Sequence, residues 1–276
     1  MTSDGQPPEI FDRKRRGALR ERAGKRDGDA FFWSVIAEEL ADRLMDVSRT
    51  FSDVLVIGPM ASFARQILHD RKAEVQLAEF VEEDRLVFQP ASFDLVISAG
   101  SLDSVNDLPG ALIQIRRCLR PDGLFLGHMF GAGTLAGLKT VMLAAHEDSA
   151  APHIHPQIDL RSAADLLSRA GFALPVVDGD VSTVRYRDLW QLVSDLRDMG
   201  VGNALAGQRR YLGRDVKERL VVAWRDRASP DGKFEEQFVH IYMSGWAPSE
   251  HQPRPAKRGS GQVSLAAILS LDTSAE

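Results

Sequence analysis

The chain has 276 residues, enough for one large domain or for a domain with an appended lobe. Hydrophobic residues make up 44% of it and charged residues 26%, as is usual for a water-soluble globular protein. No apolar run approaches the roughly 20 residues that a transmembrane helix needs. The formal net charge of -5 at pH 7 argues against a general nucleic-acid-binding protein. Met1–Pro8 is polar and lacks the apolar core of a secretory signal, and the single Cys118 cannot form an internal disulfide, so we expect a cytoplasmic protein.

Basic residues crowd the segment from Ile10 to Arg26: Arg13, Lys14, Arg15, Arg16, Arg20, Arg22, Lys25 and Arg26. Such a segment is typical either of a solvated helix face or loose arm, or of an arm that docks on an acidic partner. Apolar residues then recur at spacing four and predict an amphipathic helix packed on the following domain: Phe32, Ile36, Leu40 and Leu44. We assign residues 1–50 to this N-terminal basic segment and helix.

Buried strands alternate with helices in the first half of the chain. Apolar runs predict strands covered on both faces at Val54–Ile57, Phe93–Ala99 and Leu124–Phe130, with a shorter strand at Val75–Phe80. Helices are expected over Ala61–His69 and Asp107–Leu119, and a turn over Arg120–Gly123. This alternation indicates parallel βαβ units and an α/β, doubly wound sheet.

The second half of the chain is less regular. It predicts helices at Ser162–Ala170, with Gly171 as its C-terminal cap, and within Asp188–Met199 and Gly207–Arg225. Strands are expected at Pro175–Tyr186 and Gln237–Trp246. We therefore expect one domain over residues 51–247, with a helical insertion around 188–228. The Pro- and Gly-rich tail, residues 248–276, is expected to be loosely ordered.

Two motifs carry a family resemblance. The strand Phe93–Val96 and the turn Leu119–Gly123, which leads into the next strand, resemble the fourth and fifth strands of class I S-adenosylmethionine (SAM) dependent methyltransferases. The resemblance implies a Rossmann-like fold with a mostly parallel sheet and helical additions.

A closer resemblance covers nearly the whole chain. Its segments are Ile10–Arg13, Ser104–Pro109, Met129–Gly131, Thr134–Leu135, Pro152–Ile154, Gly171–Phe172, Asp195–Gly200 and Arg254–Gly259. They resemble the methyltransferase-like family of the mitochondrial respiratory complex I assembly factor 5 and its bacterial relatives. Eukaryotic members are described as hydroxylating an arginine of a complex I core subunit. The resemblance implies a role in modifying or assembling a protein, with SAM as cofactor and a complex I subunit as partner.

The loop after the first strand is altered. A SAM loop of this kind resembles D/E-x-G-x-G-x-G, because glycines let the backbone approach the ligand and free N–H groups meet its carboxylate. In Val56–Ser62 only Gly58 remains, and Pro59 has no N–H. The loop is either a modified cofactor site or an ordinary strand-to-helix turn. A pocket beside Gly58, or its filling by Met60 and Phe63, distinguishes the two.

The sheet is expected to be shortened at one edge. Between Gly58 and Asp94 there is room for one βαβ crossover of roughly 30 residues, where the family has two. If Val75–Phe80 is the second strand, Glu79 accepts hydrogen bonds from the ribose hydroxyls of the cofactor. If it is the third, Ala78 and Glu79 lie near the adenine. Without a ligand Glu79 is a solvated carboxylate.

The part of the predicted pocket that follows the strand Phe93–Ala99 resembles the family more than the altered loop does. Its lining residues are expected to be Ser98, Ala99, Gly100 and Leu102, so the predicted cofactor site comprises these four with Gly58 and Glu79. Asp107 reads as the N-cap of the next helix, and Asp94 as a strand-entry residue. We assign no catalytic residue.

Two further groups were weighed as sites. His153 and His155 form an H-x-H pair, but no third ligand is evident, so we assign no metal and expect this loop to position a protein substrate. Gly131, Gly133 and Thr134 follow a predicted strand, where ligands bind in open α/β sheets, or form a flexible loop.

Two functions follow. The first is a SAM-dependent methyltransferase-like protein that methylates a protein substrate or hydroxylates its arginine, in complex I assembly. The second is a non-catalytic descendant that serves as a chaperone or assembly platform and no longer binds SAM.

Overall fold

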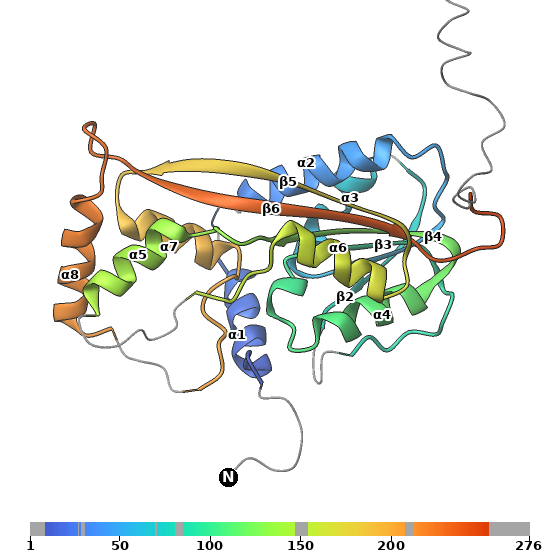
Figure 1. Ribbon diagram of the computed structural model, residues 1–276, viewed down its shortest axis with the longest axis horizontal. Coiled ribbons are helices and arrows are strands. Elements are labelled where there is room, and N and C mark those ends of the chain that lie inside the picture. Colours follow the sequence, from blue (N-terminus) through green and yellow to red (C-terminus); the bar gives the residue numbers. More distant parts are fainter. Residues whose placement is uncertain are drawn as a thin grey trace, which may run out of the picture.

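The computed structural model describes residues 9–26, 28, 31–69, 71–80, 85–146, 154–207 and 212–253. These residues form a six-stranded sheet in the order β2-β1-β3-β4-β6-β5 (Figure 1). The strands are β1 (Asp53–Ile57), β2 (Glu74–Ala78), β3 (Phe93–Ala99), β4 (Leu119–Phe130), β5 (Ala173–Tyr186) and β6 (Phe234–Trp246). The first four in chain order are parallel, and β6 runs antiparallel to both of its neighbours. The predicted α/β, Rossmann-like fold is confirmed.

The shortened edge of the sheet is formed by β2. It pairs directly with β1, with Ile57 opposite Ala78, and among the described residues it is the last strand on that side. Glu79 follows β2 immediately and so lies at the same carboxyl edge as Gly58. This is the arrangement expected if β2 is the second strand of the family's order.

Helices cover both faces of the sheet. They are α1 (Arg13–Ala23), α2 (Phe31–Met45), α3 (Ala64–Leu68), α4 (Leu108–Cys118), α5 (Ala136–Ala145), α6 (Leu160–Arg169), α7 (Leu189–Asp198) and α8 (Arg214–Arg225). Figure 1 shows α2 and α3 over one face, α4 and α6 over the other, and α5, α7 and α8 beyond the end of the parallel strands. Alternate residues of β1 separate the two cores: Val54 and Val56 pack on the side of α2, Leu55 and Ile57 on the side of α4.

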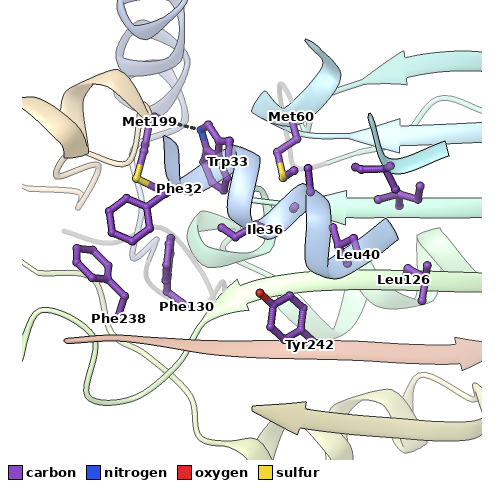
Figure 2. Close-up of a cluster of buried hydrophobic side chains, with 14 of the residues drawn as sticks. Phe32, Trp33, Ile36, Leu40, Met60, Leu126, Phe130, Met199, Phe238 and Tyr242 are labelled. Atoms are coloured by element: carbon purple, nitrogen blue, oxygen red, sulfur yellow. Dashed lines mark hydrogen bonds between the residues drawn. The ribbon is translucent and has the colours of Figure 1, made fainter. Parts of the chain in front are cut away.

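The helix predicted from spacing-four apolar residues is α2. Its buried face packs against residues from β4, β6 and the loop after α7, as Figure 2 shows for Phe32, Trp33, Ile36 and Leu40. The Trp33 indole N–H donates to the Met199 carbonyl at 3.3 Å. Because each buried aromatic side chain removes a large apolar area from water, this cluster ties the N-terminal helix firmly to the sheet.

The structure corrects three expectations. The basic segment is not a loose arm, because most of it is helix α1 and its Arg16 is buried. Arg120–Gly123 lies inside β4 rather than before it, although Asp122 has a φ of 64°, the left-handed conformation of a turn. In place of the helix expected over Ala61–His69, the chain forms a 3-10 helix, η1 (Pro59–Phe63), followed by the short helix α3 of 5 residues.

Local predictions at helix and strand ends are confirmed. Asp107 caps α4 by accepting from the Gly110 N–H at 2.8 Å. Gly171, with a φ of 82°, follows α6, and Asp94 accepts from the Ser52 N–H at 3.0 Å where β3 begins. Of the tail, only residues 248–253 are described, so the division into 1–50, 51–247 and 248–276 stays a prediction.

Candidate functional site

Three strands end together at one edge of the sheet. Gly58 follows β1, Glu79 follows β2 and Gly100 follows β3. The registers pair Ile57 with Ala78 on one side and with Ser98 on the other. Ligands bind at the carboxyl ends of parallel strands in open α/β sheets, because loops and helix starts converge there. Three of the predicted residues therefore come together at a favourable edge.

Gly58 allows the chain to leave β1 close to the end of β3. Its φ of 114° is disfavoured for other residues, and a Cβ there would overlap the Ala99 carbonyl oxygen and lie 2.6 Å from the Ser101 Oγ. The Gly58 N–H donates to the Ala78 carbonyl at 3.0 Å. Its amide is thus already used within the sheet, and Pro59 has none to offer.

A pocket of about 480 Å³ lies beside this loop. Met60 is fully buried against α2 and does not enter it, while Phe63 forms part of its wall. Its volume falls within the range of small-molecule sites. Its walls include Arg20, Trp33, Gly58, Pro59, Phe63, Ala78 and Glu79. The altered loop therefore leaves room for a ligand, which favours the modified cofactor site over an ordinary turn.

Arg20 of α1 bridges the two acceptors at this edge. It forms an ion pair with the Glu79 carboxylate, and its Nη2 donates to the Gly100 carbonyl at 2.8 Å. Burial raises the pKa of Glu79, and the charges of Arg20 and Arg16 oppose this rise. Glu79 is therefore a half-buried, paired carboxylate rather than the solvated one that we considered.

A second, smaller cavity of about 120 Å³ lies on the other side of Arg20. It extends over the ends of β3 and β4, and Thr134, one of the residues weighed as a site, belongs to its wall. The wall also includes Arg16, Gly100, Asp103, Phe130, His155 and Phe238. Because Arg20 and the loop after α7 border both spaces, groups bound in them would approach each other near Gly100.

Asp103 is an ionisable residue of the second cavity that sequence reasoning missed. It lies in the 3-10 turn η3 (Leu102–Ser104), and its Oδ1 accepts from the Phe130 N–H at 2.6 Å. Its Oδ2 is buried and has no hydrogen-bond partner among the described residues. Burial raises the pKa of Asp103 to about 6. A carboxyl group that titrates near neutrality beside a cavity is suited to general acid–base chemistry.

His155 has a structural role. Its Nε2 accepts from the Ala204 N–H at 3.0 Å, and its ring meets Phe11 edge to face with centroids 5.0 Å apart. Burial lowers its pKa to about 4, so the imidazole is neutral. His153 lies outside the described residues. Within the described part of the chain, no group of three or more His, Cys, Asp or Glu side chains is placed to hold a metal ion.

The other predicted site residues lie deeper. Ser98, Ala99 and Leu102 are buried in the protein interior and are absent from the walls of both pockets described above. Gly100 lines the second cavity, and a Cβ there would overlap the Trp33 ring, so this side chain covers the end of β3. A role for these four residues in ligand binding stays a prediction.

Comparison with known proteins supports a methyltransferase ancestry. Residues 37–127 match the family profile described as "Methyltransferase domain". The chain is 33% identical over 281 residues to the "Arginine-hydroxylase NDUFAF5, mitochondrial" of Danio rerio, covering 93% of this chain and 84% of that protein. It is 34% identical over 254 residues to the protein of the same name in Homo sapiens, covering 83% and 74%. A "Malonyl-[acyl-carrier protein] O-methyltransferase" of Xylella fastidiosa is 36% identical over 160 residues, covering 58% and 53%.

Proposed function

The chain belongs to the family of the arginine-hydroxylase NDUFAF5, and from this premise we propose that it binds SAM and modifies an arginine side chain of a protein substrate. The substrate class follows from the relatives' name, and the cofactor from the methyltransferase domain. We propose a subunit of respiratory complex I as the partner, in keeping with the family resemblance. The function is thus that of a methyltransferase-like assembly factor.

One observation carries the proposal: the pocket beside Gly58 is open and has hydrogen-bond acceptors at its edge. The Glu79 carboxylate would accept from the ribose hydroxyls, as an acidic residue does in dinucleotide folds. The Gly100 carbonyl lies next to it, joined through Arg20. These residues fit a nucleoside with a polar tail, although the loop itself contributes few donors. Bound SAM would supply an electrophilic methyl group.

The second cavity would receive the target side chain. Positioning an acceptor in line with the methyl group accounts for most of what such a transfer requires. Methyl transfer to a guanidinium nitrogen releases a proton, and Asp103, with a pKa of about 6, would accept it from that nitrogen. Asp103 therefore has the role of proton acceptor in our proposal.

The alternative is a non-catalytic assembly platform. Three features favour it, because they leave few groups free to bind a cofactor. Pro59 has no N–H, and the Gly58 N–H already donates to the Ala78 carbonyl. Arg20 already pairs with the Glu79 carboxylate and donates to the Gly100 carbonyl. In that case the exposed basic residues of α1 would contact the partner, and the pocket would have no ligand.

Mass spectrometry of complex I core subunits tests the proposal. Subunits are compared between cells with the wild-type protein, cells without it, and cells with Asp103→Asn. We expect one arginine to gain a modification that only the wild-type protein supports. Its added mass, a methylene group or an oxygen atom, distinguishes methylation from hydroxylation. Core subunits that stay unmodified in the presence of the wild-type protein, while complex I assembles only in cells that contain the protein, would instead support the platform.

The compartment stays a prediction. The name of the animal relatives places those proteins in mitochondria, whereas we predicted cytoplasm for this chain. Among the described residues, no helix is both long and apolar enough to cross a membrane.

A further inference from the structure

The loop after β1 is poor in donors for a ligand carboxylate. In a glycine-rich loop, backbone N–H groups and the N-terminus of the following helix meet this group. Here the Gly58 N–H is bound to the Ala78 carbonyl and Pro59 has no N–H. The helix that follows, α3, has only 5 residues. An amino acid carboxylate bound at this edge would therefore need a cation from elsewhere in the chain.

Arg20 is placed to be that cation. Its side chain is 13% exposed and lines the pocket beside Gly58, the second cavity, and a groove along α1 that reaches Glu79 and Phe80. Among the described residues, Arg20 alone is shared by all three walls. A guanidinium in this position faces any ligand that extends from the first pocket toward the second.

The chain holds helix α1 firmly over the site. Asp12 caps the helix by accepting from the Arg15 N–H at 3.0 Å, and its own N–H donates to the Ala204 carbonyl at 2.8 Å. The buried Arg16 donates to the carbonyls of Phe80 and Ser104, each at 2.5 Å. Arg20, one turn further along the helix, is thereby presented in a fixed position, which lowers the entropy lost when it binds a ligand.

The contacts of Arg20 are of the kind that a nucleoside with an amino acid tail would replace. A guanidinium pairs with a carboxylate through parallel N–H···O bonds, so a ligand carboxylate could take the place of Glu79. Glu79 would in turn accept from hydroxyl groups of the ribose. Arg20 keeps a carboxylate partner throughout the exchange, and Glu79 keeps the ribose hydroxyls as donors and the nearby charge of Arg16, which also acts on it.

We propose that Arg20 is the anchor for the carboxylate of the amino acid tail of a SAM-like ligand, and that it replaces the donors missing from the loop after β1. This inference rests on the proposed function and names the residue that recognises the ligand's tail. It also accounts for a cofactor loop that has lost its glycines within a fold that keeps an open pocket.

The test compares two ligands that differ by one carboxylate. Isothermal titration calorimetry is carried out on the full chain with S-adenosylhomocysteine and with its decarboxylated analogue, S-adenosyl-3-thiopropylamine. The variants are Arg20→Gln, Arg20→Lys and, as a matched control, Arg22→Gln, which changes an exposed arginine of the same helix. Thermal melts show whether each variant keeps its fold.

We expect wild-type protein and Arg22→Gln to prefer S-adenosylhomocysteine over the analogue by roughly 10- to 100-fold, the usual strength of hydrogen bonds between charged groups. Arg20→Gln should lose this preference by binding S-adenosylhomocysteine more weakly while its affinity for the analogue stays within about twofold. Arg20→Lys keeps the positive charge but not the paired N–H donors of the guanidinium. Its preference for S-adenosylhomocysteine should lie between those of the wild type and Arg20→Gln.

Other outcomes overturn the inference. If Arg20→Gln weakens both ligands equally, Arg20 acts only by holding Glu79. If Arg20→Gln binds both ligands more tightly, Arg20 competes with the ligand. An unchanged preference for S-adenosylhomocysteine over the analogue also rejects the proposed role of Arg20. If Arg20→Gln does not fold, Arg20→Lys provides the test. If Arg20 binds the ligand carboxylate, Arg20→Lys must prefer S-adenosylhomocysteine less strongly than the wild type does. Wild-type protein that binds neither ligand would reject the proposed function itself.

Discussion

Arg20 and Glu79, 59 residues apart in the chain, form an ion pair at the wall of the pocket beside Gly58. The pair joins the N-terminal helix to the end of the edge strand β2. It makes α1 part of the candidate site rather than an appendage of the sheet. Arg20 also donates to the Gly100 carbonyl, so it connects two residues of the predicted cofactor site, Glu79 and Gly100.

Glu79→Gln should weaken binding of the decarboxylated analogue by roughly tenfold, because the lost charge faces the ribose, and should weaken binding of S-adenosylhomocysteine less, because Arg20 no longer has to release the Glu79 carboxylate. This differs from the selective effect expected at Arg20. Calorimetry measures both affinities. The control is Glu74→Gln, an exposed residue at the other end of β2, which should leave them unchanged. Equal effects of the two substitutions would contradict a role for Glu79 in the site.

Asp103→Asn should stabilise the fold at alkaline pH. Burial raises the pKa of Asp103 from the ordinary 3.8 to about 6. Ionisation of this carboxyl group therefore destabilises the native state relative to the unfolded chain. The penalty is absent below pH 3.8, grows as the pH rises, and is complete above pH 6. It amounts to about 3 kcal/mol, which the neutral amide removes in part.

Urea unfolding at pH 8 and at pH 4 measures this gain. The control is Asp107→Asn, which replaces one good N-cap with another and should change stability little at either pH. An Asp103→Asn variant less stable than wild type at pH 8 would contradict a penalised carboxylate in the cavity.

His155 should make the protein sensitive to acid. Its pKa is lowered by burial from 6.5 to about 4, so on acidification the unfolded chain takes up a proton before the native state does. Stability from this residue is complete above pH 6.5 and is lost as the pH falls toward 4, by about 3 kcal/mol. Over part of this range the protonation of Asp103 has the opposite effect.

The variant that isolates the His155 contribution is His155→Gln, which keeps an acceptor for the Ala204 N–H. Its unfolding free energy should fall less between pH 7 and pH 4.5 than that of the wild type. His251→Gln, at an exposed position, serves as the control and should keep the full dependence. Identical pH profiles for His155→Gln and wild type would show that the imidazole is not held neutral.

Gly58→Ala should destabilise the fold by at least about 2 kcal/mol, because the left-handed φ and the overlap with the Ala99 carbonyl both oppose a side chain. Gly17→Ala, a glycine inside α1 with open space around it, should instead stabilise by about 0.5–1 kcal/mol. Chemical denaturation compares the two. A neutral Gly58→Ala would mean that the close approach of β1 and β3 is not required.

Much of the fold could be predicted because its signals are local. Continuous apolar runs are typical of strands covered on both faces, and β1, β3 and β4 were found this way. Helix α5 was missed since its start has neither a side-chain cap nor a regular φ: Leu135 has a φ of 59°. Its N–H groups are satisfied by the buried Glu236, about a hundred residues away, a contact that no local pattern reveals.

The site was predictable in part for the same reason. Gly58, Glu79 and Gly100 lie at one edge because each follows a strand that ends there, and their role in ligand binding stays a prediction. Of the interpretations offered for the basic segment, a solvated helix face, a loose arm or a docking arm, none foresaw the buried Arg16. Arginines are usually solvated, and the partners of Arg16, the carbonyls of Phe80 and Ser104, are distant in sequence. Asp103 was missed because its raised pKa arises from packing around it, whereas its neighbours in sequence give no such signal.

The account depends most on whether the pocket beside Gly58 binds a SAM-type ligand. Calorimetric titration of the full-length wild-type chain with SAM tests this directly. We predict one site per chain with a dissociation constant in the micromolar range, roughly -8 kcal/mol, and weaker binding in Glu79→Gln. Absence of binding heat at millimolar SAM, from protein that melts cooperatively, would contradict the account and leave the non-catalytic assembly platform.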